Sequence, residues 1–154
     1  MRPGDLIIVR GHNLFDRAVE DLEKSPYSHV AGIVNDTQLI QVEDFKLTSY
    51  GPISQYVGQD IYTWPDWVTD DQRMGMVAWA NNHVGSHYAN GILIWELIRY
   101  TTHIMLPWWV AKNHYICSEY WASAAISVGV DLWPGIKYPS PVDMATKMIY
   151  EGRV

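Results

Sequence analysis

The chain is poor in cysteine and in charge. Cys117 is the single cysteine among 154 residues, so no internal disulfide can form and the fold is not a disulfide scaffold. Charged residues make up 18% of the chain, with a formal net charge of −6, and the Lys and Arg residues do not cluster along the sequence. Nucleic-acid binding requires a basic surface, so this composition argues against a nucleic-acid partner.

The sequence predicts neither a cleaved leader nor a membrane span. The opening residues, Met-Arg-Pro-Gly-Asp, lead straight into a strand-like segment, which is not the pattern of a cleaved leader. The longest apolar stretch covers 91–106, but it contains Glu96, Arg99 and His103 and predicts a buried helix rather than a membrane span. The localisation stays open, between the cytoplasm and a particle that delivers the protein to a cell envelope.

What the chain does have is apolar and aromatic surface. Apolar residues make up 48% of a length that suits one domain, and eight of the residues are tryptophans. Excess aromatic surface is typical of a tight core, a hydrophobic substrate groove or a partner interface. Four of the tryptophans are candidates for contact with a larger protein assembly: Trp95, Trp108, Trp109 and Trp133.

The hydrophobic pattern predicts strands in the first half of the chain and helices in the second. Strands are expected over 5–10, 28–34 and 37–45, with one or two more in 53–64, and helices over 13–22, 69–84, 90–106 and 117–128 and from 140 onward. Thr69 and Ser140 have the sequence context of helix N-caps. Strands followed by helices, without regular alternation, predict an α+β fold with an antiparallel sheet packed against helices.

Cys117 stands where the helix over 117–128 is expected to begin. A helix N-terminus stabilises a thiolate, because its unpaired N–H groups and the positive end of the dipole favour negative charge. A lone cysteine is otherwise often a small buried hydrophobic residue. Cys117 is therefore a candidate nucleophile that needs a base within hydrogen-bond reach.

His29 is the best candidate base among the six histidines, because a strand holds its side chain in a fixed direction. If strands 28–34 and 37–45 form a hairpin whose turn centres on Asp36, His29 stands opposite Glu43. Directly opposed residues have Cβ atoms roughly 4.5–5.5 Å apart, so the carboxylate could orient the imidazole. A shift in register by one residue places Val42 or Asp44 opposite His29 instead. Gln41 is a further candidate for the orienting group.

Two other interpretations compete with this one. His83 and His87 have a spacing that can place two zinc ligands on one helical face, but Gly85 interrupts the helix and no third ligand of known spacing follows. We therefore expect neither a metal nor a cofactor. The second is a non-catalytic structural or binding module, in which Cys117, His29 and Glu43 have ordinary structural roles.

Four short runs along the chain carry a family resemblance. They are Pro-Gly-Asp-Leu-Ile-Ile-Val-Arg, Ser-Pro-Tyr-Ser-His-Val-Ala-Gly-Ile-Val, Leu-Ile-Gln-Val-Glu-Asp and Tyr-Ile-Cys-Ser-Glu-Tyr-Trp-Ala. In this order the chain resembles the circularly permuted NlpC-like cysteine hydrolases, the papain-like branch that includes relatives of lecithin retinol acyltransferase. Gly85-Ser86-His87-Tyr88 and Ser140-Pro141-Val142-Asp143 resemble two further elements of that family. One departure is Ala31, which stands where the family commonly has glycine.

The resemblance implies one permuted papain-like domain over 1–154, with Cys117 as nucleophile, His29 as base and Glu43 as the third polar residue. It also implies a thiol hydrolase that works by acyl transfer. Peptidoglycan stem peptides rank first as the substrate. The protein would then be a component of a phage or phage-like particle that acts on the cell wall. The alternative is a lipid or another acyl ester or amide, hydrolysed or used for acyl transfer.

Overall fold

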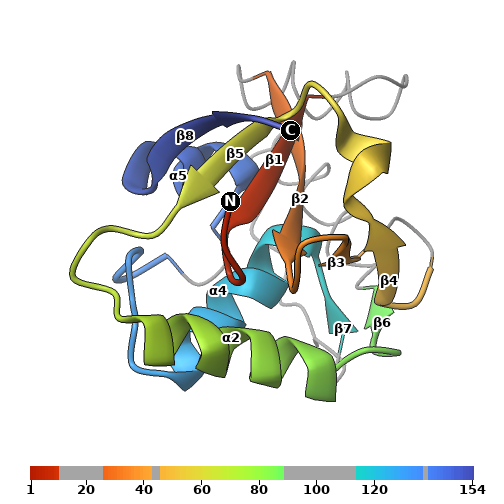
Figure 1. Ribbon diagram of the computed structural model, residues 1–154. Helices are drawn as coiled ribbons and strands as arrows, with labels where there is room; N and C mark the ends of the chain where they lie inside the picture. Colours follow the sequence, from red (N-terminus) through yellow and green to blue (C-terminus); the bar gives the residue numbers. More distant parts are fainter. Residues whose placement is uncertain (11–25, 43–45, 89–113, 137–138) are drawn as a thin grey trace, which may run out of the picture.

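The computed structural model describes residues 1–10, 26–42, 46–88, 114–136 and 139–154. Its main sheet has six antiparallel strands in the order β4-β3-β2-β1-β5-β8 (Figure 1). The strands are β1 Leu6–Arg10, β2 Tyr27–Ile33, β3 Gln38–Gln41, β4 Ser49–Pro52, β5 Asp60–Thr63 and β8 Ile149–Arg153. The helices are η1 Ile53–Tyr56, α2 Asp70–Asn82, α4 Cys117–Ser127 and α5 Pro141–Lys147, and a small parallel pair joins β6 His87–Tyr88 to β7 His114–Tyr115. The α+β class and the antiparallel sheet are confirmed.

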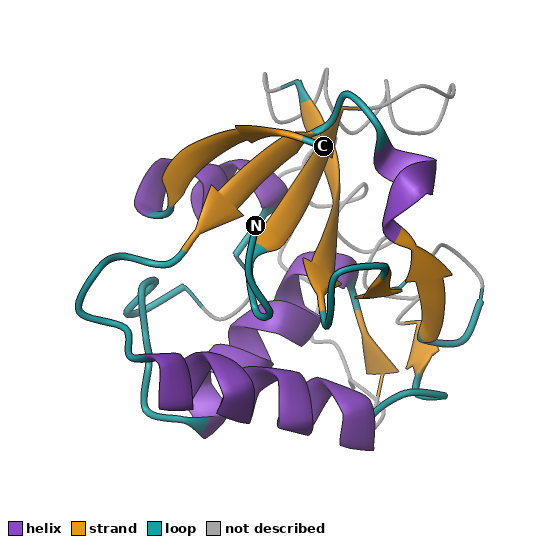
Figure 2. Ribbon diagram, viewed as in Figure 1, coloured by secondary structure: helices purple, strands orange, loops and turns teal. Residues whose placement is uncertain are grey.

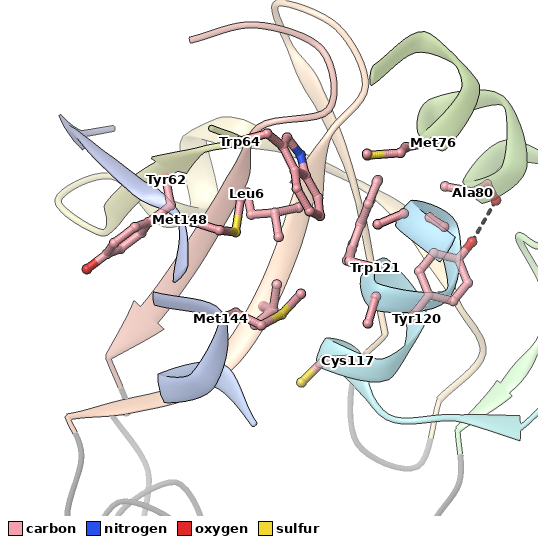
Figure 3. Packing of buried hydrophobic residues seen from close by; sticks show 14 of the residues in the cluster. Leu6, Tyr62, Trp64, Met76, Ala80, Cys117, Tyr120, Trp121, Met144 and Met148 are labelled. Atoms are coloured by element: carbon pink, nitrogen blue, oxygen red, sulfur yellow. Dashed lines mark hydrogen bonds between the residues drawn. The ribbon is translucent and has the colours of Figure 1, made fainter. Parts of the chain in front are cut away.

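The two faces of the sheet belong to different hydrophobic clusters, because side chains alternate along each strand. Leu6 and Ile8 of β1 enter the cluster that also contains residues of α2, α4 and α5, here called the helix-side cluster (Figure 3). Ile7 and Val9 enter a second cluster on the other face. The second cluster also contains Ala31, Ile33, Leu39 and Ile53, with Tyr56 and Val154 packed against it.

The hairpin of β2 and β3 has the register that the sequence predicts. Ala31 pairs with Gln41 and Ile33 with Leu39, which is the pairing expected for a turn centred on Asp36. The Asn35 side chain closes this turn, since its Oδ1 accepts from the backbone N–H groups two and three residues on, at 3.0 and 2.9 Å. Glu43, the residue that this register would place opposite His29, lies outside the described residues.

The predicted helix starts are confirmed where a local cap defines them. Thr69 and Gln72 form a reciprocal capping box at α2, and Ser140 and Asp143 form another at α5. Gly129 follows the C-cap of α4 with φ of 78°, a conformation that glycine adopts without strain. The predicted helices over 13–22 and 90–106 lie outside the described residues.

The 53–64 region contributes one strand, β5, as predicted, and its first residues form the 3-10 helix η1 directly after β4. Strand β4 was not predicted, because it lies between the segments that were expected to form strands. Strand β8 was not predicted, since its residues are mostly exposed and show no apolar alternation. It nevertheless pairs with β5 at the edge of the sheet (Figure 2).

Helix α4 packs directly on β2 through Trp121 and Gly32. A Cβ atom at Gly32 would lie 2.0 Å from Cζ2 of Trp121, so a larger residue at this position would displace the helix. The indole is fully buried, as is that of Trp64, and Trp133 is almost fully buried. Trp133 therefore belongs to the core rather than to a partner interface; Trp95, Trp108 and Trp109 lie outside the described residues. Within the described ranges, none of the helices has the length and hydrophobicity that crossing a bilayer requires.

Candidate functional site

Cys117 is the first residue of α4, as predicted, and its side chain is 7% exposed within the helix-side cluster. The N-cap is Ile116, whose side chain cannot accept a hydrogen bond from the first turn. The starts of α2 and α5 are different, because each is closed by a capping box. The N-cap side chain therefore accepts no hydrogen bond from the first N–H groups of α4. A thiolate or an oxyanion at this helix start could accept from them.

His29 lies beside an irregularity of β2. It pairs with Val9 of β1, but the next pair joins Arg10 to Tyr27, so that Ser28 is an extra residue on β2. A β-bulge of this kind changes the direction of neighbouring side chains and is common next to active sites. The imidazole stacks on the Tyr56 ring, with centroids 6.2 Å apart and an angle of 27° between the planes.

Gln41 provides a polar group on the same face of the sheet as His29. It is a diagonal neighbour of His29 across the hairpin, because it pairs with Ala31, two residues further along β2. Its Oε1 accepts hydrogen bonds from Tyr56 Oη at 2.7 Å and from Gln55 Nε2 at 2.5 Å. Tyr56 was not predicted as part of the site, because no periodicity in the sequence shows that η1 carries it over β2 and β3.

The described residues place the predicted pair in two environments. Cys117 belongs to the helix-side cluster, whereas His29 pairs with Val9 and stacks on Tyr56, both of which belong with the second cluster on the other face. Alternation along β2 therefore places His29 on the same face of the sheet as Tyr56 and Gln41. Any approach of the imidazole to the thiol depends on the bulged end of β2. Glu43, the third predicted residue, lies outside the described residues.

The two histidines considered as zinc ligands do not share a helical face. His83 is the C-cap of α2; its Nδ1 lies 2.7 Å from the Trp79 carbonyl oxygen and its ring stacks on the Trp79 indole at 3.8 Å. His87 lies in β6 and bridges to Leu47. Within the part of the chain that the structure describes, no group of three or more His, Cys, Asp or Glu side chains is arranged to hold a metal ion.

A charged cluster at one end of the sheet was not predicted. Asp60, buried in β5, accepts from Arg10 Nη2 at 2.8 Å, from Arg153 Nε at 3.1 Å and from Tyr27 Oη at 3.0 Å. The Tyr27 and Tyr62 hydroxyls are 2.8 Å apart. These residues come from β1, β2, β5 and β8, so that only the sheet topology brings them together.

The cluster perturbs the ionisation of its members. Burial opposes the charge of Asp60, but hydrogen bonds from Arg10, Tyr27 and Arg153 outweigh it and hold the pKa of this carboxyl below its usual value. Burial raises the pKa of Tyr27, as do its hydrogen bonds with Tyr62 and Asp60. The hydrogen bond to Asp60 raises the pKa of the Arg10 guanidinium. At neutral pH Asp60 is therefore a carboxylate, Arg10 a guanidinium ion and Tyr27 a neutral phenol.

Asp60 is expected to contribute stability that is lost in acid. Because its pKa is lower in the folded than in the unfolded state, the contribution is complete above the unfolded pKa of about 3.9 and disappears as the pH falls through the folded value. Asp60→Asn should lower the free energy of unfolding by about 2 kcal/mol at pH 7, and less at pH 2–3. Urea denaturation across this range measures the difference, with the exposed Asp66→Asn as control. A difference that stays constant with pH would contradict the assignment.

Comparison with known proteins adds no family to this picture. No protein-family model matches the chain. No curated protein matches its sequence either.

Proposed function

We propose that the protein is a cysteine-dependent hydrolase that acts by acyl transfer, with Cys117 as nucleophile and His29 as general base. The observation that carries this proposal is the start of α4, where Cys117 follows an isoleucine N-cap, while the two other described α-helices are closed by capping boxes. A helix start without a side-chain acceptor stabilises negative charge both on sulfur and on a substrate oxygen.

The reaction proceeds in two balanced steps. The imidazole of His29 takes the proton from the Cys117 thiol, the sulfur attacks the substrate carbonyl carbon, and the tetrahedral oxyanion accepts from backbone N–H groups at the start of α4. The imidazolium then protonates the leaving amine or alcohol as the carbonyl carbon's bond to it breaks, which leaves a thioester. Water, deprotonated by the imidazole, attacks the thioester and releases a carboxylic acid and the thiol.

This mechanism requires the imidazole of His29 to be aimed at the sulfur. In the described contacts the imidazole faces Tyr56 on the other side of β2, so the mechanism also requires the end of β2 at the Ser28 bulge, where the regular pairing breaks, to turn His29 toward the thiol. Glu43 is the proposed orienting carboxylate, from the register that Ala31 and Gln41 establish. Gln41, held by Tyr56 and Gln55, is the alternative orienting group.

The proposed substrate is an amide of a peptidoglycan stem peptide. The protein is proposed to reach the cell wall as a component of a phage or phage-like particle. A second candidate is an acyl ester or amide of a lipid. The many apolar and aromatic residues of the chain, eight tryptophans among them, favour this second candidate, since they would suit an acyl chain.

Alkylation of Cys117 tests the proposal without knowledge of the substrate. At pH 7 iodoacetamide should modify the wild-type thiol at least about 10-fold faster than it modifies a free cysteine, because a thiolate is the reactive form. His29→Ala should remove most of this excess, and His87→Ala, a change of the same residue type at an exposed position, should not. Mass spectrometry of the quenched reaction gives the rates.

Two results would contradict the proposal. One is alkylation no faster than that of a free thiol in the folded wild-type protein, with full alkylation once the protein is unfolded in urea. The other is an equal rate for wild type and His29→Ala, which would remove His29 as the base. Either result would favour a structural or binding module that has this fold without turnover.

A further inference from the structure

The cluster around Asp60 contains more positive than negative charge. Both carboxylate oxygens are used, Oδ2 by Arg10 and Tyr27 and Oδ1 by Arg153, so one buried negative charge holds two guanidinium ions. The side chains of Arg10 and Arg153 are 46% and 58% exposed. The three charged side chains of the cluster therefore sum to +1, in a chain whose net charge is −6.

The two guanidinium groups retain donors for a further acceptor. Arg10 uses Nε and Nη2 toward Asp60, whereas Arg153 uses Nε alone. Within the described part of the chain, the terminal nitrogens of Arg153 are not used in any other hydrogen bond or ion pair. Asp60 fixes the orientation of both groups, and a guanidinium held in this way loses little conformational freedom when it binds a carboxylate through two parallel hydrogen bonds.

This charged cluster adjoins the side of the sheet on which Cys117 lies. Tyr27 and Tyr62, which hydrogen-bond to each other beside Asp60, both pack with the helix-side cluster that contains Cys117. Figure 3 shows Tyr62, Met148, Met144 and Cys117 in succession along that cluster. Tyr62, Met144 and Met148 are buried, so a substrate that reaches both the thiol and the guanidinium ions would lie over this cluster rather than between its side chains.

We propose that Arg10 and Arg153 form a subsite for a carboxylate of the substrate, with Asp60 as the positioning residue that holds both guanidinium groups. This inference rests on the proposed function, and it names an acidic peptide or acyl amide as the preferred substrate class. Asp60 itself does not touch the substrate, because both of its oxygens are occupied by the arginines and Tyr27.

Binding of glutarate tests the subsite without turnover. The side-chain Nε–H signal of Arg153 in an NMR titration should shift on addition of glutarate and saturate in the millimolar range. Glutaramide, which has the same shape without charge, should cause no shift. Arg153→Gln should weaken glutarate binding at least about 5-fold, while Lys147→Gln, which removes an equal charge beyond the opposite end of β8, should leave it unchanged. Thermal melts of both variants verify that they fold.

Three outcomes would overturn the carboxylate subsite. They are no shift with glutarate, equal binding by wild type and Arg153→Gln, and saturation by inorganic phosphate but not by glutarate. Cys117→Ala should bind glutarate as tightly as wild type, so that the subsite and the hydrolase are tested separately. Glutarate binding in a protein whose thiol is unreactive would leave the subsite in place and reject the hydrolase.

Discussion

Cys117→Ala is expected to lower kcat/KM for the cleaved substrate by a factor of at least about 10³, because the acyl-enzyme can no longer form. Incubation with muropeptides, followed by mass spectrometry, should show loss of the parent ions and gain of one water across the cleaved amide with wild type alone. A panel of lipid esters and amides tested in parallel distinguishes the two proposed substrate classes. Release of fatty acid without muropeptide cleavage would reverse their ranking.

The fold of the Cys117→Ala variant should change little. Removal of one sulfur from a cluster of many apolar side chains costs about 1 kcal/mol, which separates lost chemistry from lost structure. Ser118→Ala, a change at the adjacent and fully buried residue, is the matched control and should retain activity. Full activity of Cys117→Ala would show that the reaction, if present, does not use this thiol.

The elements that could be predicted are those defined by local chemistry. Thr69 and Ser140 form capping boxes, so the starts of α2 and α5 follow from a few neighbouring residues. Asn35 closes the hairpin turn, and the register of β2 and β3 follows from that turn. Strand β8 could not be predicted in this way. It is exposed and its pairing with β5 depends on the tertiary arrangement alone.

The same distinction between local and tertiary features applies to the candidate site. The position of Cys117 at a helix start could be predicted from the sequence around it, and it is confirmed. The face that His29 presents could not, because the bulge at Ser28 and the arrival of Tyr56 from η1 are tertiary features. The Asp60 cluster was missed for a related reason: its arginines lie 50 and 93 positions from Asp60 in the chain, so no charge pattern in the sequence predicts it.

A buried ion pair joins Asp5, the residue before β1, to Arg73 of α2. Arg73 Nη1 donates to Asp5 Oδ1 and to Thr63 Oγ1, each at 2.9 Å, and Nη2 donates to the Trp64 carbonyl oxygen at 3.0 Å. Both charged side chains are almost fully buried. The pair therefore links α2 to Asp5 before β1 and to Thr63 and Trp64 at the end of β5.

Arg73→Met is expected to lower the free energy of unfolding by about 3–5 kcal/mol, because it leaves the Asp5 carboxylate buried without its cation. Typical domains are stable by about 5–15 kcal/mol, so this variant should unfold at a much lower urea concentration. Arg153→Gln, which removes the same charge from an exposed pair with Asp60, should cost about 1 kcal/mol or less.

The double variant Asp5→Asn with Arg73→Met identifies the origin of that loss. If the cost comes from an uncompensated buried charge, removing the Asp5 charge as well should recover part of the stability, and the two substitutions should be non-additive. If it comes from lost packing of the arginine side chain, the double variant should be no more stable than Arg73→Met. A loss below about 1 kcal/mol for Arg73→Met alone would mean that the ion pair does not hold α2 to the sheet.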